Sequence, residues 1–212
     1  MADNYLYVVF STTPFKIGKF IRLITGYNYN HVSISLTKDL KKMYSFSRYF
    51  KNAPLHGGFT EESILRYENK GKSAKIKICA IPVDENGINQ ICAILENMNN
   101  NHSQYNYNII SALFSLFKKR AIIPYSYTCT EFVAELLSNF KNSFDIDAQK
   151  YYSIKEFDKI FENYKIYEGS VIPYSENADW GNDLFLNKKR ISEITFLTAI
   201  SYWTVLKLYL TN

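Results

Sequence analysis

Apolar and polar residues alternate over several short stretches of the chain, which is typical of strands with one buried face. Residues 31–36 and 75–81 show the alternation most clearly. Lys38-Asp39 is a turn candidate, so the segment after it is the returning strand of a hairpin. The pattern and the β-rich composition together predict strands over residues 5–11, 31–36, 42–47, 75–81 and 165–172.

Other segments carry apolar residues at helical spacing. The spacing predicts helices over residues 88–98 and 107–119, a helix that begins at Cys129, and a short one from a capping box at Ser153 through Phe161. Thr13-Pro14 predicts the start of a further helix over residues 14–24, because proline is tolerated in the first turn. Residues 52–60, with Pro54 and Gly57-Gly58, are predicted to form a loop. This order of elements indicates an α+β fold with a mostly antiparallel sheet packed against helices.

The tail of the chain has a different pattern. Residues 175–183 are polar, whereas residues 194–210 are strongly apolar with Lys207 as their only charge. The polar residues of this apolar stretch fall at every third position, which spirals around a helix and gives no polar face. The sequence therefore predicts a domain over residues 1–174, followed over 175–212 by a polar linker and an apolar C-terminal helix. Such a helix can pack on the domain or a partner, lie at a membrane surface through residues 194–210, or span a membrane, for which its length is at the short limit.

Length and charge narrow the possible classes. The 212 residues are enough for one large domain or a domain with an appendage. The formal charge of +5 is spread along the chain, so nucleic-acid binding is not expected, although a weak preference for anionic membrane surfaces remains. The N-terminus lacks the features of a secretory signal, which favours a cytoplasmic protein, with attachment to a membrane through the C-terminal helix as an alternative. The sequence does not indicate an oligomeric state.

The three cysteines do not form a recognisable set of ligands. Cys79, Cys92 and Cys129 lack metal-type spacing, and their odd number argues against a disulfide framework. We therefore expect no metal and no cofactor, and a reducing compartment that suits an unpaired thiol.

Cys129 is the most informative of the three. Thr128 is a plausible N-cap and Glu131 follows three residues later, so Cys129 is predicted to begin a helix. A thiol there lies at the positive end of the helix dipole, which favours the thiolate that a nucleophilic cysteine needs. The alternative is a small apolar residue of the core.

A cysteine nucleophile needs a base, and the chain has three histidines. His31 begins a predicted strand, where a rigid element can aim the imidazole, whereas His56 lies in a glycine-rich loop and His102 follows three asparagines. We therefore consider His31 the best candidate for the base, with a purely structural histidine as the alternative.

The order of these motifs resembles a known family. The segment 29–36, YNHVSISL, followed much later by 127–134, YTCTEFVA, resembles the circularly permuted papain-fold group of cysteine peptidases and amidases. This group includes the YaeF/YiiX-like bacterial proteins and is related to the NlpC-type cell-wall peptidases. In it the histidine strand precedes the cysteine helix, as it does here. Segments 44–48, 57–61, 105–108 and 167–169 also resemble parts of bacterial members, so the likeness covers about residues 5–174.

The resemblance implies a permuted papain-like fold and papain-type chemistry. Cys129 would be the nucleophile and His31 the general base, and the reaction would pass through a thioester. The backbone N–H of Cys129 would donate to the oxyanion, and the Tyr107 hydroxyl is a further candidate for that role. The implied activity is hydrolysis of an amide bond in a peptide or an amidated cell-wall fragment.

The third member of the site departs from the family pattern. The group often carries Glu or a second His on the strand after the histidine strand, but residues 43–47 have neither. Ser45 or Ser47 could accept a hydrogen bond from the imidazole only weakly. Glu61 or Glu62 could fold back to orient the ring, and Glu62 is the preferred candidate.

Two other functions stay open. Lipid acyl transfer or thiol-dependent lipid hydrolysis would suit the apolar tail, because the lecithin–retinol acyltransferase relatives share the permuted order. Those relatives usually carry a second His where this chain has Met43. The other alternative is a catalytically idle binding or membrane-docking protein. A peptide, an amide or a lipid is thus the expected substrate class.

Overall fold

The fold is built on one long, mostly antiparallel sheet. The structure is a computed structural model that describes residues 4–13, 18, 22–23, 26–53, 55–69, 72–139 and 144–211. The helix predicted over residues 14–24 falls largely outside these residues. The eight strands of the sheet run in the order β10-β7-β1-β2-β3-β4-β8-β9, and neighbouring strands are antiparallel except β8 and β9. They are β1 (Asn4–Ser11), β2 (His31–Ser35), β3 (Met43–Arg48), β4 (Gly57–Glu62), β7 (Lys75–Val83), β8 (Asn106–Tyr107), β9 (Ser126–Tyr127) and β10 (Lys165–Ser170). The short strands β5 (Glu68–Asn69) and β6 (Lys72–Ser73) form a separate ribbon.

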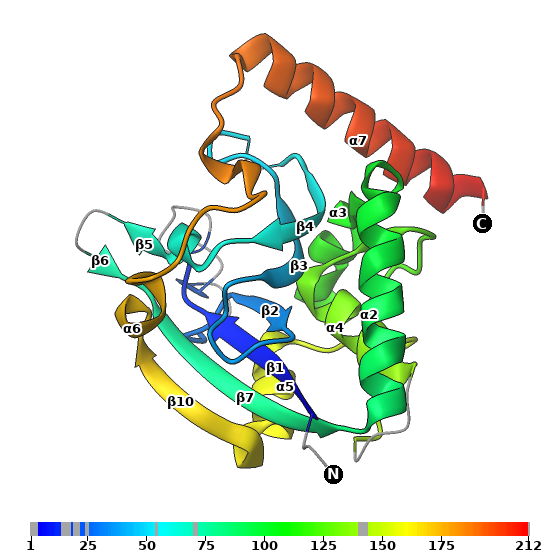
Figure 1. Cartoon of the computed structure of the whole chain (residues 1–212). Coiled ribbons are helices and arrows are strands. Elements are labelled where there is room, and N and C mark those ends of the chain that lie inside the picture. The colour runs from blue at the N-terminus through cyan, green and yellow to red at the C-terminus, as the bar shows by residue number, and fades with distance from the viewer. Residues whose placement is uncertain are drawn as a thin grey trace.

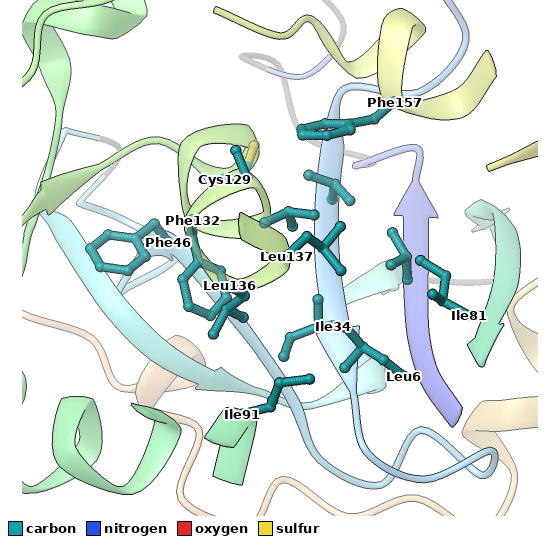
Figure 2. Packing of buried hydrophobic residues seen from close by; sticks show 14 of the residues in the cluster. Leu6, Ile34, Phe46, Ile81, Ile91, Cys129, Phe132, Leu136, Leu137 and Phe157 are labelled. Atoms are coloured by element: carbon teal, nitrogen blue, oxygen red, sulfur yellow. The ribbon is translucent and has the colours of Figure 1, made fainter. Parts of the chain in front are cut away.

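Helices α2 (Glu85–Asn100), α4 (Cys129–Ser138) and α5 (Ile154–Ile160) supply side chains to the core on one face of the sheet (Figure 1). Val32 and Ile34 of β2 point toward α4, where Phe132 and Leu136 are fully buried. Figure 2 shows Cys129 at the start of α4, next to this packed layer. The core therefore fixes the beginning of α4 relative to β2.

The other face of the sheet is covered by shorter elements. The 3₁₀ helix η1 (Ile64–Tyr67) and the single-turn helix α6 (Ile172–Ser175) pack there around a second cluster that includes Met43 and Ile78. Because side chains alternate along a strand, Ser33 and Glu62 point to this face, opposite Val32. Three further 3₁₀ turns are η2 (His102–Gln104), η3 (Ser115–Phe117) and η4 (Glu162–Tyr164).

The segment after α6 lies against the domain. Asp183 caps the 3₁₀ turn η5 (Leu184–Leu186) and is buried. Its carboxylate accepts a hydrogen bond from the backbone N–H of Ser63 at 2.8 Å and forms an ion pair with Arg66. Residues 175–186 are thus held to the second face of the sheet before the chain reaches its last helix.

The last helix, α7 (Ile191–Thr211), confirms the predicted C-terminal helix and extends it at both ends. By length and composition α7 could cross a membrane, which is weak evidence on its own. Ser201 and Val205, in its middle, are buried against the domain, and the Ser201 hydroxyl lies 2.9 Å from Nδ1 of His56.

The α+β class, the antiparallel sheet and all five predicted strands are confirmed. The two capping boxes, at Thr128 and Ser153, are also present. The predicted helix over 107–119 is shorter, because Tyr107 belongs to β8 and α3 (Ile109–Phe114) gives way to η3.

The predicted loop over residues 52–60 is wrong at its end, where β4 begins at Gly57. Gly57-Gly58 reads as a turn in the sequence, but here both glycines lie in a strand with backbone packed against them. A Cβ at Gly57 would lie 2.3 Å from the carbonyl oxygen of Ser47, and one at Gly58 would lie 2.2 Å from that of Tyr105. The glycines therefore serve close approach of neighbouring strands rather than a turn.

Candidate functional site

Cys129 is the first residue of α4, as the sequence predicts. The Thr128 hydroxyl accepts from the Glu131 N–H at 3.3 Å, and the Glu131 carboxylate accepts from the Thr128 N–H at 2.7 Å. Glu131 is itself held by Arg120, whose Nε lies 3.2 Å from Oε1. This double cap fixes the start of the helix and so the position of the thiol. Cys129 keeps 9% of its surface exposed.

His31 begins β2 at the end of the sheet where α4 also begins. The backbone pairing between β2 and β3 is confined to Ile34 with Tyr44 and Ser35 with Met43, so these strands are not paired near His31. Both the Glu62 carboxylate and the Cys129 thiol act on the imidazole. Hydrogen-bonding and electrostatic interaction with Cys129 are among the causes that raise the pKa of this imidazole.

Glu62 is the carboxylate that contacts the imidazole. Both of its oxygens lie 3.1 Å from Nε2 of His31, and Oε2 accepts a hydrogen bond from the Ser33 hydroxyl at 2.7 Å. The Tyr67 hydroxyl donates to Oε2 at 2.9 Å, and Nη1 of Arg66 donates to Oε1 at 3.3 Å. With a side chain that is 1% exposed, Glu62 is a buried carboxylate whose donors come from four different residues.

Arg66 links this carboxylate to the C-terminal part of the chain. Its Nη2 donates to Oδ1 of Asp183 at 2.6 Å, and its Nε pairs with Oδ2. The guanidinium also donates to the Ser47 hydroxyl at 2.9 Å and lies over the ring of Phe185, 4.7 Å from its centroid. Both carboxylates beside Arg66 are therefore neutralised without exposure to water.

The charges of this cluster reinforce one another. Burial alone would lower the pKa of His31, but the negative charge of Glu62 and the hydrogen bonds with Cys129 and Glu62 outweigh it and raise this pKa to about 10. Burial alone would raise the pKa of Glu62, yet the charge and hydrogen bond of His31, with Arg66 and Ser33, hold it well below 4.5. The structure thus favours an imidazolium–carboxylate pair over the neutral pair.

Two tyrosines lie close enough to Cys129 to interact with it electrostatically. Tyr107 on β8 is one, and burial followed by the charges of Cys129 and Glu131 raises its pKa. Tyr151 is the other, with a pKa raised first by burial and then by Glu156 and Cys129. Of the sequence candidates, Tyr107 therefore lies in the neighbourhood of the thiol.

The remaining sequence candidates lie elsewhere. The Ser47 hydroxyl accepts its hydrogen bond from Arg66, so it supports the cluster around Glu62 rather than the imidazole. Ser45 is buried, and among the described residues its hydroxyl has no hydrogen-bond partner. Glu61 points to the opposite face of β4 and lies 3.9 Å from Lys42. Glu62 is therefore the candidate that the structure brings to His31.

Sequence reasoning missed four members of this cluster: Ser33, Arg66, Tyr67 and Asp183. Ser33 had a readable signal, because it lies two residues after His31 in an alternating strand and so shares its face. Arg66 follows Glu62 by four residues, but a helical turn after β4 was not predicted. Asp183 is 117 residues from Arg66, and nothing local points to it.

The described residues contain no group of three or more His, Cys, Asp or Glu side chains that could hold a metal ion. The candidate site combines a thiol at a helix start (Cys129), an imidazole (His31) and a buried carboxylate (Glu62). Comparisons of the chain with protein-family models, curated proteins and solved structures give no significant match. The permuted papain-fold resemblance therefore rests on the motifs and their order alone.

Proposed function

We propose that this protein is a cysteine hydrolase of the permuted papain-like type that cleaves an amide bond. The observation that carries the proposal is the His31 imidazole, which lies 3.1 Å from the Glu62 carboxylate and interacts with the Cys129 thiol. These three residues come from a helix start and two strands far apart in the sequence. A thiol beside an imidazole that a third group orients is the signature of an activated nucleophile.

In the proposed reaction, Cys129 attacks the carbonyl carbon of the amide, and its sulfur becomes bonded to that carbon. His31 holds the proton that is then given to the leaving amine as the carbon–nitrogen bond breaks. Water next attacks the thioester, His31 accepts a proton from it, and the carboxylic acid leaves with Cys129 restored. Glu62 stays ionised throughout and holds the ring in place.

The oxyanion would be held at the start of α4. The N–H groups of the first turn of a helix have no carbonyl partner within it, and the Cys129 N–H is one of these. Tyr107 is the candidate for a second donor because it is half-buried and interacts electrostatically with Cys129.

The idle alternative was motivated by the missing acid on the strand after His31. Glu62, one strand further along the sheet, supplies a carboxylate in its place, and this favours an enzyme. Lipid acyl transfer or lipid hydrolysis is kept as the second candidate because of one observation: Tyr202 of the apolar helix α7 interacts electrostatically with Tyr107. Helix α7 also contacts β8, the strand that carries Tyr107, and an apolar helix there would suit a lipid substrate.

Thiol alkylation tests the proposal without a known substrate. Cys92 is exposed and serves as the reference thiol, whereas burial raises the pKa of Cys79 to about 12. We expect iodoacetamide at pH 6 to 7 to modify Cys129 at least about tenfold faster than Cys92, although Cys129 is far less exposed. Cys92→Ala and Cys129→Ala variants assign the two rates by peptide mass spectrometry.

Equal and slow modification of all three cysteines would overturn both enzyme proposals. Turnover of peptide amides, compared with lipid esters and amides in vesicles, separates the two candidates. Any hydrolytic activity that survives Cys129→Ala would show that the nucleophile lies elsewhere.

A further inference from the structure

Helix α7 leaves most of its apolar surface uncovered. Val205 is buried (1% exposed), but Trp203 is 69% exposed. Only 11% of the most apolar stretch of α7 is buried. An uncovered apolar surface of this length marks a docking site for a membrane or another protein. The large apolar side chains of α7 that are exposed are Ile191, Phe196, Ile200, Trp203, Leu206, Tyr209 and Leu210.

A second exposed apolar element lies beside α7. Val205 packs on Ala121 and Ile123, and α3 contacts α7 directly. On this neighbouring segment Leu113, Leu116 and Phe117 are exposed, with Phe117 at 74%. In Figure 1, α7 (orange to red) runs along the outside of the molecule past α3. We call the surface formed by α7 and residues 109–122 the α7–α3 surface.

Grooves accompany these exposed side chains. One of about 420 Å³ runs along the first half of α7 between Leu55 and Tyr202, and one of about 500 Å³ lies between Phe114 and Phe117. Apolar side chains beside open grooves can take up lipid tails at a bilayer surface.

The positive charge of the chain is concentrated in this surface and in the residues just before α7. Residues 109–122 and 187–211 contain seven Lys and Arg residues and one acid, Glu193, whereas the whole chain has a net charge of only +5. The rest of the chain therefore carries no positive excess. Arg120 is paired with Glu131, but Lys118 and Lys119 are exposed beside η3, and Lys188 and Arg190 are exposed just before α7.

We propose that the α7–α3 surface docks on a bilayer that contains anionic lipids, with α7 lying in the plane of the interface. The exposed cations before α7 and beside η3 complement anionic headgroups, and the apolar side chains of the surface enter the acyl region. Trp203 and Tyr209 are residue types favoured at that boundary.

The contacts of α7 favour this orientation over a spanning one. Val205 and Ser201 are in the middle of the helix, and both are buried against the domain. A spanning helix would place them at the centre of the bilayer, which would require breaking the contact with Ala121 and Ile123 and the Ser201–His56 hydrogen bond. In the plane of the interface, these contacts are kept.

This inference does not require Cys129 to be a nucleophile. If it is one, docking would bring the site to the bilayer, because Tyr202 of α7 interacts with Tyr107 near the thiol. A lipid-borne substrate would then reach Cys129 from the membrane.

The test uses the full chain with the substitution Trp180→Phe. The chain has two tryptophans, so this leaves Trp203 as the single fluorescent tryptophan. The protein is mixed with phosphatidylcholine vesicles with or without phosphatidylglycerol. We expect sedimentation with the anionic vesicles, a blue shift of Trp203 emission, and stronger quenching by lipids brominated near the headgroup than by lipids brominated near the chain ends.

Two pairs of variants separate charge from apolar contact. Lys188→Glu with Arg190→Glu should weaken binding at least about tenfold, and Phe196→Ser with Trp203→Ser should abolish it, read by sedimentation. The matched controls are Lys38→Glu with Lys150→Glu, and Leu23→Ser with Ile166→Ser, which change exposed residues outside the surface. Both controls should bind like the parent.

Three results would overturn the proposal. The first is a lack of binding to either vesicle. The second is equal binding to neutral and anionic vesicles, which would remove the role of charge. The third is a stable dimer that buries Trp203 without lipid, because the surface would then be an interface between two copies of the chain.

Discussion

The carboxylate of Glu62 crosses β3 to reach the imidazole of His31, with both oxygens 3.1 Å from Nε2. The side chain of β3 on the same face at that point is Ser45, which is small and buried. A larger side chain there would block the crossing. The contact occupies Nε2 and leaves Nδ1 as the nitrogen that can serve the Cys129 thiol.

Replacing Glu62 with glutamine keeps the shape of the side chain and removes its charge. The charge is what opposes the effect of burial on His31, so we expect the pKa of His31 to fall and the alkylation of Cys129 near neutral pH to slow at least about tenfold. Imidazole resonances in an NMR titration report the first effect, and iodoacetamide kinetics the second. Glu61→Gln removes the same charge from the other face of β4 and should leave both unchanged. Equal behaviour of the two variants would contradict the role given to Glu62.

Arg66 and Asp183 should stabilise the fold as a coupled pair. Arg66→Met leaves two buried carboxylates without their shared partner, so we expect a loss of about 3 to 5 kcal/mol in the free energy of unfolding. Asp183→Asn should also destabilise, and the double variant should lose less than the sum, with a coupling of about 1 to 3 kcal/mol. Urea unfolding of the four proteins provides the measurement. Additive losses would mean that the tail segment does not support the cluster around Glu62.

Local patterns were enough to predict the two central residues of the site. A capping box places Cys129 at a helix start whatever surrounds it, and alternation places His31 in a strand. The partner of His31 was harder to predict because its position depends on β4. Glycines normally signal a turn, and in this chain Gly57-Gly58 instead allows neighbouring backbone to come close.

The features that the sequence did not predict depend on contacts between residues far apart in the chain. Asp183 lies in a polar stretch that reads as a linker, and its burial is caused by Arg66, which no periodicity connects to it. The position of α7 likewise depends on the packing of Val205 against Ala121 and Ile123, not on any pattern within the helix. Sequence patterns describe elements well, but they do not say which elements meet.

Stability in acid should report the ionised state of Glu62. In the unfolded chain this carboxyl takes up a proton near its ordinary pKa of 4.5, whereas in the folded protein its pKa is well below that value. Between these two pKa values the unfolded chain binds more protons than the folded protein, so lowering the pH there favours unfolding. The stabilisation is fully present above about pH 4.5 and is lost as the pH falls through the folded pKa, by at most about 1.4 kcal/mol per pH unit.

Urea unfolding of the parent and of Glu62→Gln between pH 3 and pH 7 measures this effect. The glutamine cannot titrate, so the loss of the stabilisation that the parent owes to ionised Glu62 should shrink the difference in unfolding free energy between the two proteins as the pH falls below about 4.5. A difference that stays constant over the whole range would mean that Glu62 is not held ionised by His31 and Arg66.

Tyr107 can be tested separately from the nucleophile, because alkylation and acyl transfer make different demands on the site. Attack on iodoacetamide forms no oxyanion, whereas attack on an ester or amide does. Tyr107→Phe removes only the hydroxyl from a half-buried ring, so alkylation of Cys129 should proceed at the parent rate. Formation of the acyl-enzyme from an activated ester should slow by about tenfold or more if the hydroxyl donates to the oxyanion.

Tyr127→Phe, at the paired position of β9, is the matched control and should change neither rate. Loss of both reactions in Tyr107→Phe would instead show that Tyr107 positions the thiol, and equal acylation rates in both variants would remove it from the site.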